Sequence, residues 1–157
     1  MKRLLATAAL IIASGPALAC ETATVGSLEI SQAWSRASNG TSRPGVVYLT
    51  IRNAGAAADA LTGIATPVSG MPMLHQTVMT QGVASMQHAM QVPVPAGGSV
   101  ALAPGGYHAM LMDLTESLKE GETFPVTLSF RDAGEVTIPV MVQSTGASGP
   151  GCADDGQ

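Results

Sequence analysis

The side chains best suited to chemistry in this sequence are histidines and methionines, and they gather in one segment. All three histidines and seven of the nine methionines fall between residues 71 and 112: Met71, Met73, His75, Met79, Met86, His88, Met90, His108, Met110 and Met112. Thioether sulfur is soft and uncharged and imidazole binds late transition metals, so together they select Cu(I) over zinc, calcium or magnesium. A single methionine is more often a flexible core residue than a ligand, so it is the clustering that favours a metal site.

Strand alternation would place many of these side chains on common faces. Successive side chains of a strand point to opposite faces. In the segment 107–114, His108 and Met110 therefore share the face opposite Leu111. That second face can be buried in a core, so we expect His108 and Met110 to point toward a rim or a neighbouring loop. Two further segments repeat this spacing on either side of a predicted turn at 80–82: Met73, His75 and Met79, then Met86, His88 and Met90.

Other kinds of site find little support. No glycine-rich loop opens a helix, no serine has the context of a nucleophile elbow, and carboxylates are scattered. Blue-copper electron transfer needs a cysteine ligand, but Cys20 and Cys152 lie far from the cluster along the chain. We therefore expect no enzyme. Neutral ligands leave the charge of Cu(I) uncompensated and limit affinity, which suits a carrier that must release its ion.

The first residues read as a secretory signal peptide over 1–19. Lys2 and Arg3 precede a short apolar run, and Ala17-Leu18-Ala19 offers small residues before a cleavage site. No later segment is long and apolar enough to span a membrane. We expect export to a bacterial periplasm and, in that oxidising compartment, a disulfide between Cys20 and Cys152. Lipid attachment at Cys20 is the less favoured alternative.

The remainder, 20–143, is expected to form one domain, followed by a flexible tail over 144–157. After the signal peptide the chain has five basic and eleven acidic residues. This acidic balance argues against nucleic acid as a partner. Short alternating segments separated by Gly, Pro and Asn predict an all-β sandwich or barrel: 24–30, 46–53, 59–66, 72–79, 107–114, 123–130 and 135–142. The segment 116–122 is expected to be a loop or a single turn.

The spacing of four of these residues resembles the signature of the PCuAC-type periplasmic copper chaperones. His75 is followed by ten residues and Met86, then by twenty-one residues and His108-Ala109-Met110. The flanking blocks are similar as well and cover most of the chain: 25–37, 48–63, 74–90 and 102–130. The resemblance implies a cupredoxin-like Greek-key β-sandwich in which His75, Met86, His108 and Met110 bind Cu(I).

The same resemblance implies a function and a partner. Such a chaperone would act as a monomer and deliver copper to the copper-accepting domain of cytochrome c oxidase, for its binuclear copper centre. Two alternatives stay open: copper buffering or tolerance without a specific recipient, and a structural β-sandwich whose methionines only pack. His88 and Met90 depart from the family pattern and could form an auxiliary or transfer position, or could simply be solvated. The tail contains neither His nor Met, which argues against a second, Cu(II) site there.

Overall fold

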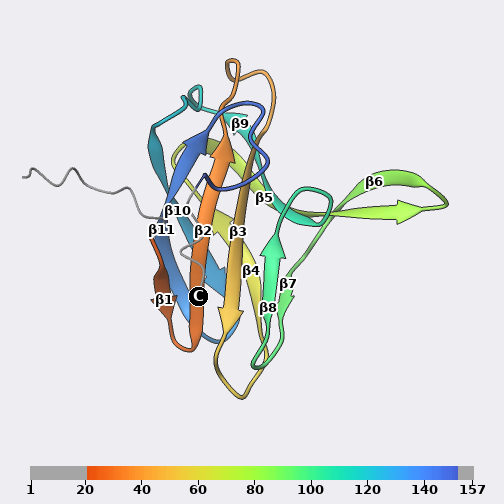
Figure 1. The fold of residues 1–157 in the computed structure, drawn as a ribbon, viewed down its shortest axis with the longest axis vertical. Helices are drawn as coiled ribbons and strands as arrows, with labels where there is room; N and C mark the ends of the chain where they lie inside the picture. The colour runs from red at the N-terminus through yellow and green to blue at the C-terminus, as the bar shows by residue number, and fades with distance from the viewer. Residues whose placement is uncertain (1–20, 152–157) are drawn as a thin grey trace, which may run out of the picture.

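The computed structural model describes residues 21–151, and these residues form strands and loops without a helix. Eleven strands follow one another along the chain (Figure 1): β1 Ala23–Val25, β2 Leu28–Arg36, β3 Gly45–Asn53, β4 Asp59–Ala65, β5 Ser69–Thr80, β6 Val83–His88, β7 Val92–Val94, β8 Ser99–Leu102, β9 Tyr107–Leu114, β10 Thr123–Phe130 and β11 Gly134–Gln143. Within this part of the chain no helix could cross a bilayer. The expected signal peptide, Cys20 and Cys152 lie outside the described residues.

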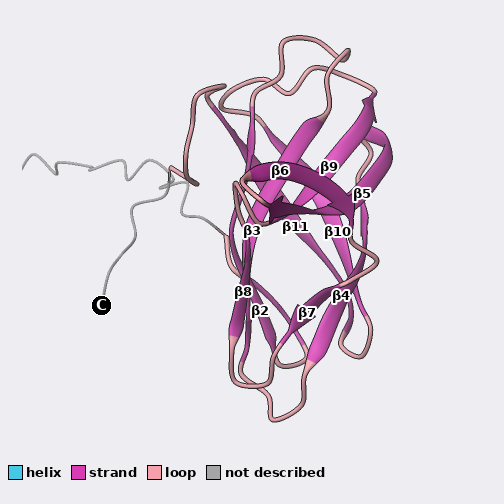
Figure 2. Ribbon diagram, turned by 90° about the vertical axis from the view of Figure 1, so that its right-hand side faces the viewer, coloured by secondary structure: helices cyan, strands magenta, loops and turns pink. Residues whose placement is uncertain are grey.

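The strands form one continuous, strongly curved sheet that folds over on itself. Its order is β6-β5-β9-β8-β3-β2-β11-β10-β4-β7, with β1 paired to β2. Most neighbours are antiparallel, and the two parallel pairs are β11 with β2 and β8 with β9. Figure 2 shows the resulting two layers with the loops gathered at their ends. The prediction of an all-β sandwich is confirmed.

The core is built from alternate side chains of the two layers. Its largest fully buried members are aliphatic, and most are Val, Ile or Leu from the long strands: Leu28, Ile30, Val47, Leu49, Ile51, Leu61, Val92, Val94, Leu102, Leu111, Leu128 and Ile138. Burial of these side chains provides the main driving force for folding. It also fixes the register, since a slip by one residue would turn every apolar side chain to the opposite face.

Several element boundaries differ from the sequence prediction. The expected strand 24–30 is a hairpin, because Gly26 adopts a positive φ of 57° and separates β1 from β2. Strand β2 then continues to Arg36, which the pattern did not indicate because Gln32, with a φ of 54°, interrupts its alternation. Strands β7 and β8 were not predicted, since they contain only three and four residues. The segment 116–122 is a loop, as expected.

The irregularity at Gln32 changes which face the end of β2 presents. The register with β3 shifts between Ser31 and Trp34, after which Trp34 lies opposite Tyr48. The two rings are tilted by 39° to each other with their centroids 4.7 Å apart, and the guanidinium of Arg36 lies 5.9 Å from each centroid. Arg36 Nε also donates to the carbonyl of Ala147. Part of the segment expected to be a flexible tail is thus held against β2.

The hairpin of β5 and β6 projects from the side of the sandwich (Figure 1). Its turn consists of Gln81 and Gly82, with φ values of 50° and 81°, between the paired residues Thr80 and Val83. Two positive φ angles match the twist of an antiparallel hairpin, and glycine accepts such an angle without steric cost. The predicted turn at 80–82 is therefore confirmed, and it carries β6 back beside β5.

Candidate metal centre

The histidines and methionines converge on one face of the three strands at the β6 edge of the sheet. On β5, His75 is paired with His108 of β9 on one side and with His88 of β6 on the other. Directly paired residues point to the same face, so the three imidazoles form a row across the sheet. By the same register, six methionines face this way: Met71, Met73, Met79, Met86, Met110 and Met112.

The closest contact in this row joins β5 to β9. His75 Nδ1 lies 2.9 Å from the sulfur of Met110. Met110 is paired with Met73, two residues before His75 on β5, so the contact is a diagonal one across neighbouring strands. Diagonal neighbours are within reach of long side chains. An imidazole nitrogen and a thioether sulfur thus lie side by side.

His108 forms the buried end of the row. Its side chain is 5% exposed, so of the two expected surroundings, an open rim or a neighbouring loop, the structure shows the loop. Its Nδ1–H donates to the carbonyl of Gly106 at 3.0 Å, and a carbonyl can only accept. In the neutral imidazole this bond places the proton on Nδ1 and leaves the lone pair on Nε2. Among the buried side-chain nitrogen and oxygen atoms of residues 21–151, His108 Nε2 alone has no hydrogen-bond partner.

An unpaired buried nitrogen needs an explanation, because burying an acceptor without a partner costs about 1–3 kcal/mol. A metal ion would use the lone pair, and the bond from Nδ1 to a carbonyl is the arrangement that commonly orients a metal-binding histidine. Gly106 was not found from the sequence as part of the site, because a backbone acceptor leaves no signal in residue type. The hydrogen bond at Nδ1 and the unpaired Nε2 of His108 therefore fit a metal ligand.

Met86 occupies the exposed end of the site. It is paired with Thr77, so it lies one diagonal step from His75 on the same face, and its side chain is 66% exposed. The structure therefore brings His75, His108 and Met110 together and leaves Met86 on the solvent side. The methionine side chain has three rotatable bonds, so the Met86 sulfur can reach an ion near His75 by rotation.

The protonation of His75 is disfavoured by burial and by like charges. Burial, and then the positive charges that His108 and His88 would carry, lower the pKa of His75 below its usual 6.5. The ring centroid of His75 is 5.9 Å from that of His108 and 6.0 Å from that of His88, so a positive charge on either neighbour disfavours protonation of His75. The lowered pKa keeps His75 in its neutral, metal-binding form at neutral pH.

The segment that carries the candidate ligands has no charged side chain apart from its histidines. Between Asp59 and Asp113 the sequence has no Asp, Glu, Lys or Arg. Within residues 21–151, no three His, Cys, Asp or Glu side chains are placed to hold a metal ion together. Hard divalent cations favour oxygen ligands, which this face does not gather. What remains is a neutral set of imidazoles and thioethers, suited to a soft monovalent ion.

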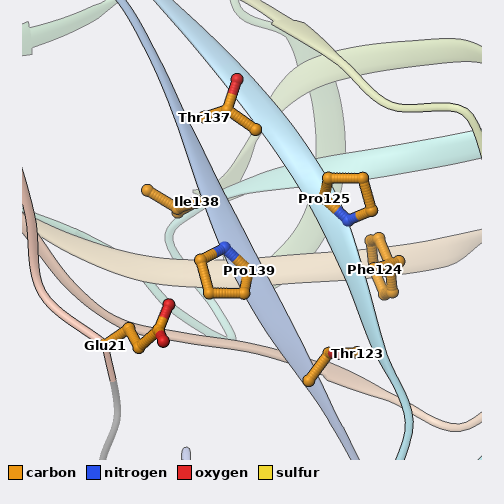
Figure 3. Close-up of a pocket in the computed structure, with 7 residues that line it drawn as sticks. All are labelled: Glu21, Thr123, Phe124, Pro125, Thr137, Ile138 and Pro139. Atoms are coloured by element: carbon orange, nitrogen blue, oxygen red, sulfur yellow. The ribbon is translucent and has the colours of Figure 1, made fainter.

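A hollow of the molecule lies away from this face and is lined by different side chains. It measures about 330 Å³ and is bordered by β10, β11 and Glu21. Figure 3 shows Pro125 and Pro139 on its adjacent strands, with Glu21 at one side. It contains one carboxylate and no imidazole or thioether. Its size alone therefore does not make this hollow a candidate for a metal site.

Comparisons with known proteins agree with the fold and the family resemblance. The family model "Putative lipoprotein LpqE-like" matches residues 28–142. The chain is 34% identical over 117 residues to "Putative lipoprotein Lxx21020" of Leifsonia xyli subsp. xyli, covering 74% of this chain and 69% of that protein.

Solved structures extend the likeness to three dimensions. The copper-bound PCuAC domain of PmoF2 superimposes with a TM-score of 0.68 at 26% identity, covering 79% of this chain and 98% of that domain. The solution structure of Cu(I)-loaded DR1885 of Deinococcus radiodurans gives 0.61 at 31% identity, covering 78% and 80%. The fold is therefore the cupredoxin-like β-sandwich of PCuAC domains. The chain belongs to the LpqE-like family, which is a PCuAC-type family.

Proposed function

We propose that this protein is a copper chaperone that binds Cu(I) through His75, Met86, His108 and Met110 and passes it on by ligand exchange, without catalysis. The observation that carries the proposal is the unpaired Nε2 of buried His108, next to a row in which His75 already contacts Met110. Membership in a PCuAC-type family supports it, as do structural neighbours described as copper-bound and Cu(I)-loaded.

The open side of the site suits release of the ion. His108 anchors the buried end, whereas Met86 is 66% exposed and can leave the ion first. Thioethers are neutral, so no ligand holds Cu(I) by charge. Methionine also avoids the disulfide formation that a free thiol would undergo in an oxidising compartment. An uncharged ligand set with one exposed member thus favours exchange over permanent storage.

We infer an extracytoplasmic location and a copper-accepting protein as partner. Relatives described as lipoproteins support the location. The signal peptide over 1–19, and either a lipid or a disulfide at Cys20, are parts of this proposal, and intact-mass measurement on the exported protein distinguishes them. The binuclear copper centre of cytochrome c oxidase is the recipient that the family resemblance suggests.

A competition titration with a chromogenic Cu(I) chelator tests the binding step. We expect one tightly bound ion per chain. A variant that combines His108→Ala with Met110→Leu should lose this tight binding, while circular dichroism shows an intact fold. Failure of the wild-type protein to take up Cu(I) would leave a structural sandwich as the better description. Transfer to the purified copper domain of the oxidase tests the recipient. Tight binding without such transfer would favour copper buffering instead.

A further inference from the structure

His88 stands in the same relation to His75 as the proposed ligand His108 does, but on the solvent side. It is paired directly with His75 across β5 and β6, and the two ring centroids are 6.0 Å apart with the rings nearly perpendicular, at 88°. The corresponding values for His75 and His108 are 5.9 Å and 83°. His75 is thus a central imidazole with an equivalent neighbour on each side.

The two neighbours differ in their access to solvent. His108 is buried, whereas His88 is exposed, as is every residue of β6. The strand does not leave the sheet at His88, because the backbone N–H of Ala89 donates to the carbonyl of Leu74 at 2.8 Å. An ion arriving from solution therefore meets His88 and Met86 before it can reach the lone pair of His108.

The three imidazoles are not arranged around one point. In residues 21–151 no three His, Cys, Asp or Glu side chains are placed to hold a metal ion together, and the His75 ring lies between the other two. As the side chains are placed, an ion next to His75 has either His108 or His88 as its second imidazole. The arrangement creates two positions that have His75 in common, one buried and one open.

The surroundings of His88 have the ligand chemistry of the inner position. Met86 lies two residues before it on the same strand and face. His88 also borders a hollow of about 170 Å³ that is lined by Met73 and Met90, and all its lining residues are uncharged. Met90 is 84% exposed and can add a further sulfur. Imidazole with neutral thioethers again selects Cu(I).

We propose that His88 is an exchange ligand, which binds Cu(I) together with His75 and Met86 in an outer position through which the ion enters and leaves. Moving inward, the ion keeps His75 and exchanges His88 for His108 and Met110. Moving outward, it reverses this exchange. No electron is transferred and no proton is required, because all ligands are neutral. The inference rests on the proposed function and adds a route to it.

Kinetics separates an exchange ligand from a resident one. In His88→Gln we expect the equilibrium affinity for Cu(I) to stay within about twofold of wild type, because the inner ligands are intact. The rates of uptake from a weak Cu(I) chelator and of loss to a strong one should both fall by roughly fivefold or more, about 1 kcal/mol in activation free energy. Both rates must change together if the affinity is constant. Met79→Leu is the matched control, since Met79 is an exposed methionine of the same hairpin.

Removing the inner ligands should allow Cu(I) binding at the outer position to be measured by itself. The double variant His108→Ala/Met110→Leu is expected to keep a weaker Cu(I) site, with X-ray absorption showing both nitrogen and sulfur ligands. Adding His88→Gln should abolish it. The proposal is overturned if His88→Gln exchanges copper at wild-type rates, or if it weakens binding as much as Met110→Leu does. A wild-type protein that takes up no Cu(I) would instead defeat the proposed function itself.

Discussion

The Nδ1 atom of His75 lies 2.9 Å from the sulfur of Met110, on neighbouring strands of the sheet. This contact brings a nitrogen from β5 and a sulfur from β9 to one point, although the residues are far apart in the chain. Met110→Leu keeps the shape and apolar character of the side chain and removes the sulfur. We expect Cu(I) affinity to fall by roughly tenfold or more, about 1.4 kcal/mol, with thermal stability nearly unchanged.

The matched control for this variant is Met112→Leu. Met112 lies on the same strand and the same face, paired with Met71 rather than with a residue next to His75. We expect it to bind Cu(I) as the wild type does in the chelator competition. Equal losses in the two variants would mean that the methionines support the site only through packing.

Cu(I) affinity should depend on pH in a way set by His75. Burial, assisted by the charges of His108 and His88, lowers the pKa of His75 below 6.5. Protons and Cu(I) compete for the same lone pair, so a lowered pKa of His75 means that protons compete only at lower pH. We expect constant affinity from about pH 8 to 6.5 and a decline only at lower pH, as free imidazole titrates near 6.5. Titrations between pH 8 and 5 check this, and an onset well above pH 6.5 would contradict it.

His88→Gln should also change the protonation of its neighbour in the metal-free protein. The variant removes one positive charge that disfavours protonation of His75, so we expect the pKa of His75 to rise. Because burial is the larger cause of its lowered pKa, the rise should be partial and should not reach 6.5. NMR titration of the imidazole resonances measures it directly. An unchanged pKa would show that the two rings do not interact.

The effect of charge on Cu(I) binding can be tested by introducing a carboxylate into this uncharged segment. Thr77 is paired with Met86 on the ligand face, so Thr77→Glu places a carboxylate next to the ion. At a separation of about 8 Å and an effective dielectric constant of roughly 40–80, the attraction is about 0.5–1 kcal/mol, or roughly two- to fivefold in affinity. Thr77→Gln is the neutral control. The gain should shrink in high salt, and a gain shared by Thr77→Gln would contradict the electrostatic explanation.

Stability should depend on Asp59, far from the site. Its carboxylate accepts backbone N–H groups from Ala60 at 2.7 Å, Asp132 at 3.0 Å and Ala133 at 2.9 Å. Burial by itself would raise the pKa of Asp59, but these bonds, helped by Arg131, lower it below 3.8. Asp59→Ala leaves the three N–H groups without their acceptor, and each unsatisfied group costs about 1–3 kcal/mol. We expect a loss of roughly 2–4 kcal/mol at pH 7.

The pH dependence of that loss follows from the direction of the shift. A carboxyl whose pKa is lower in the folded state stabilises the fold above its unfolded pKa, and this contribution disappears as the pH falls through the folded value. Urea unfolding of wild type and Asp59→Ala should therefore differ most near neutral pH and converge in strong acid. A difference that stays constant down to about pH 2, below the unperturbed value near 3.9, would point to packing instead. Asp59→Asn, which keeps one oxygen, should fall between the two.

Much of this protein could be predicted from residue order alone. Alternating apolar residues indicated the strands that contain His75 and His108, because burial of one face of a sheet imposes a period of two. The turn at Gln81 and Gly82 was readable for a similar reason, since few residues accept positive φ angles. The choice of Cu(I) followed from donor chemistry, which belongs to the side chains wherever they lie.

Only the tertiary structure decided how these residues meet. No pattern in the sequence specifies that β5 lies between β6 and β9, because strand order depends on pairings between distant segments. That order makes His75 the centre of a row, buries His108, and places the carbonyl of Gly106 where it fixes the imidazole. The same order gives His88 its place opposite His75. Residue types determine which ion can bind, whereas long-range strand pairing determines where it binds and from which side it arrives.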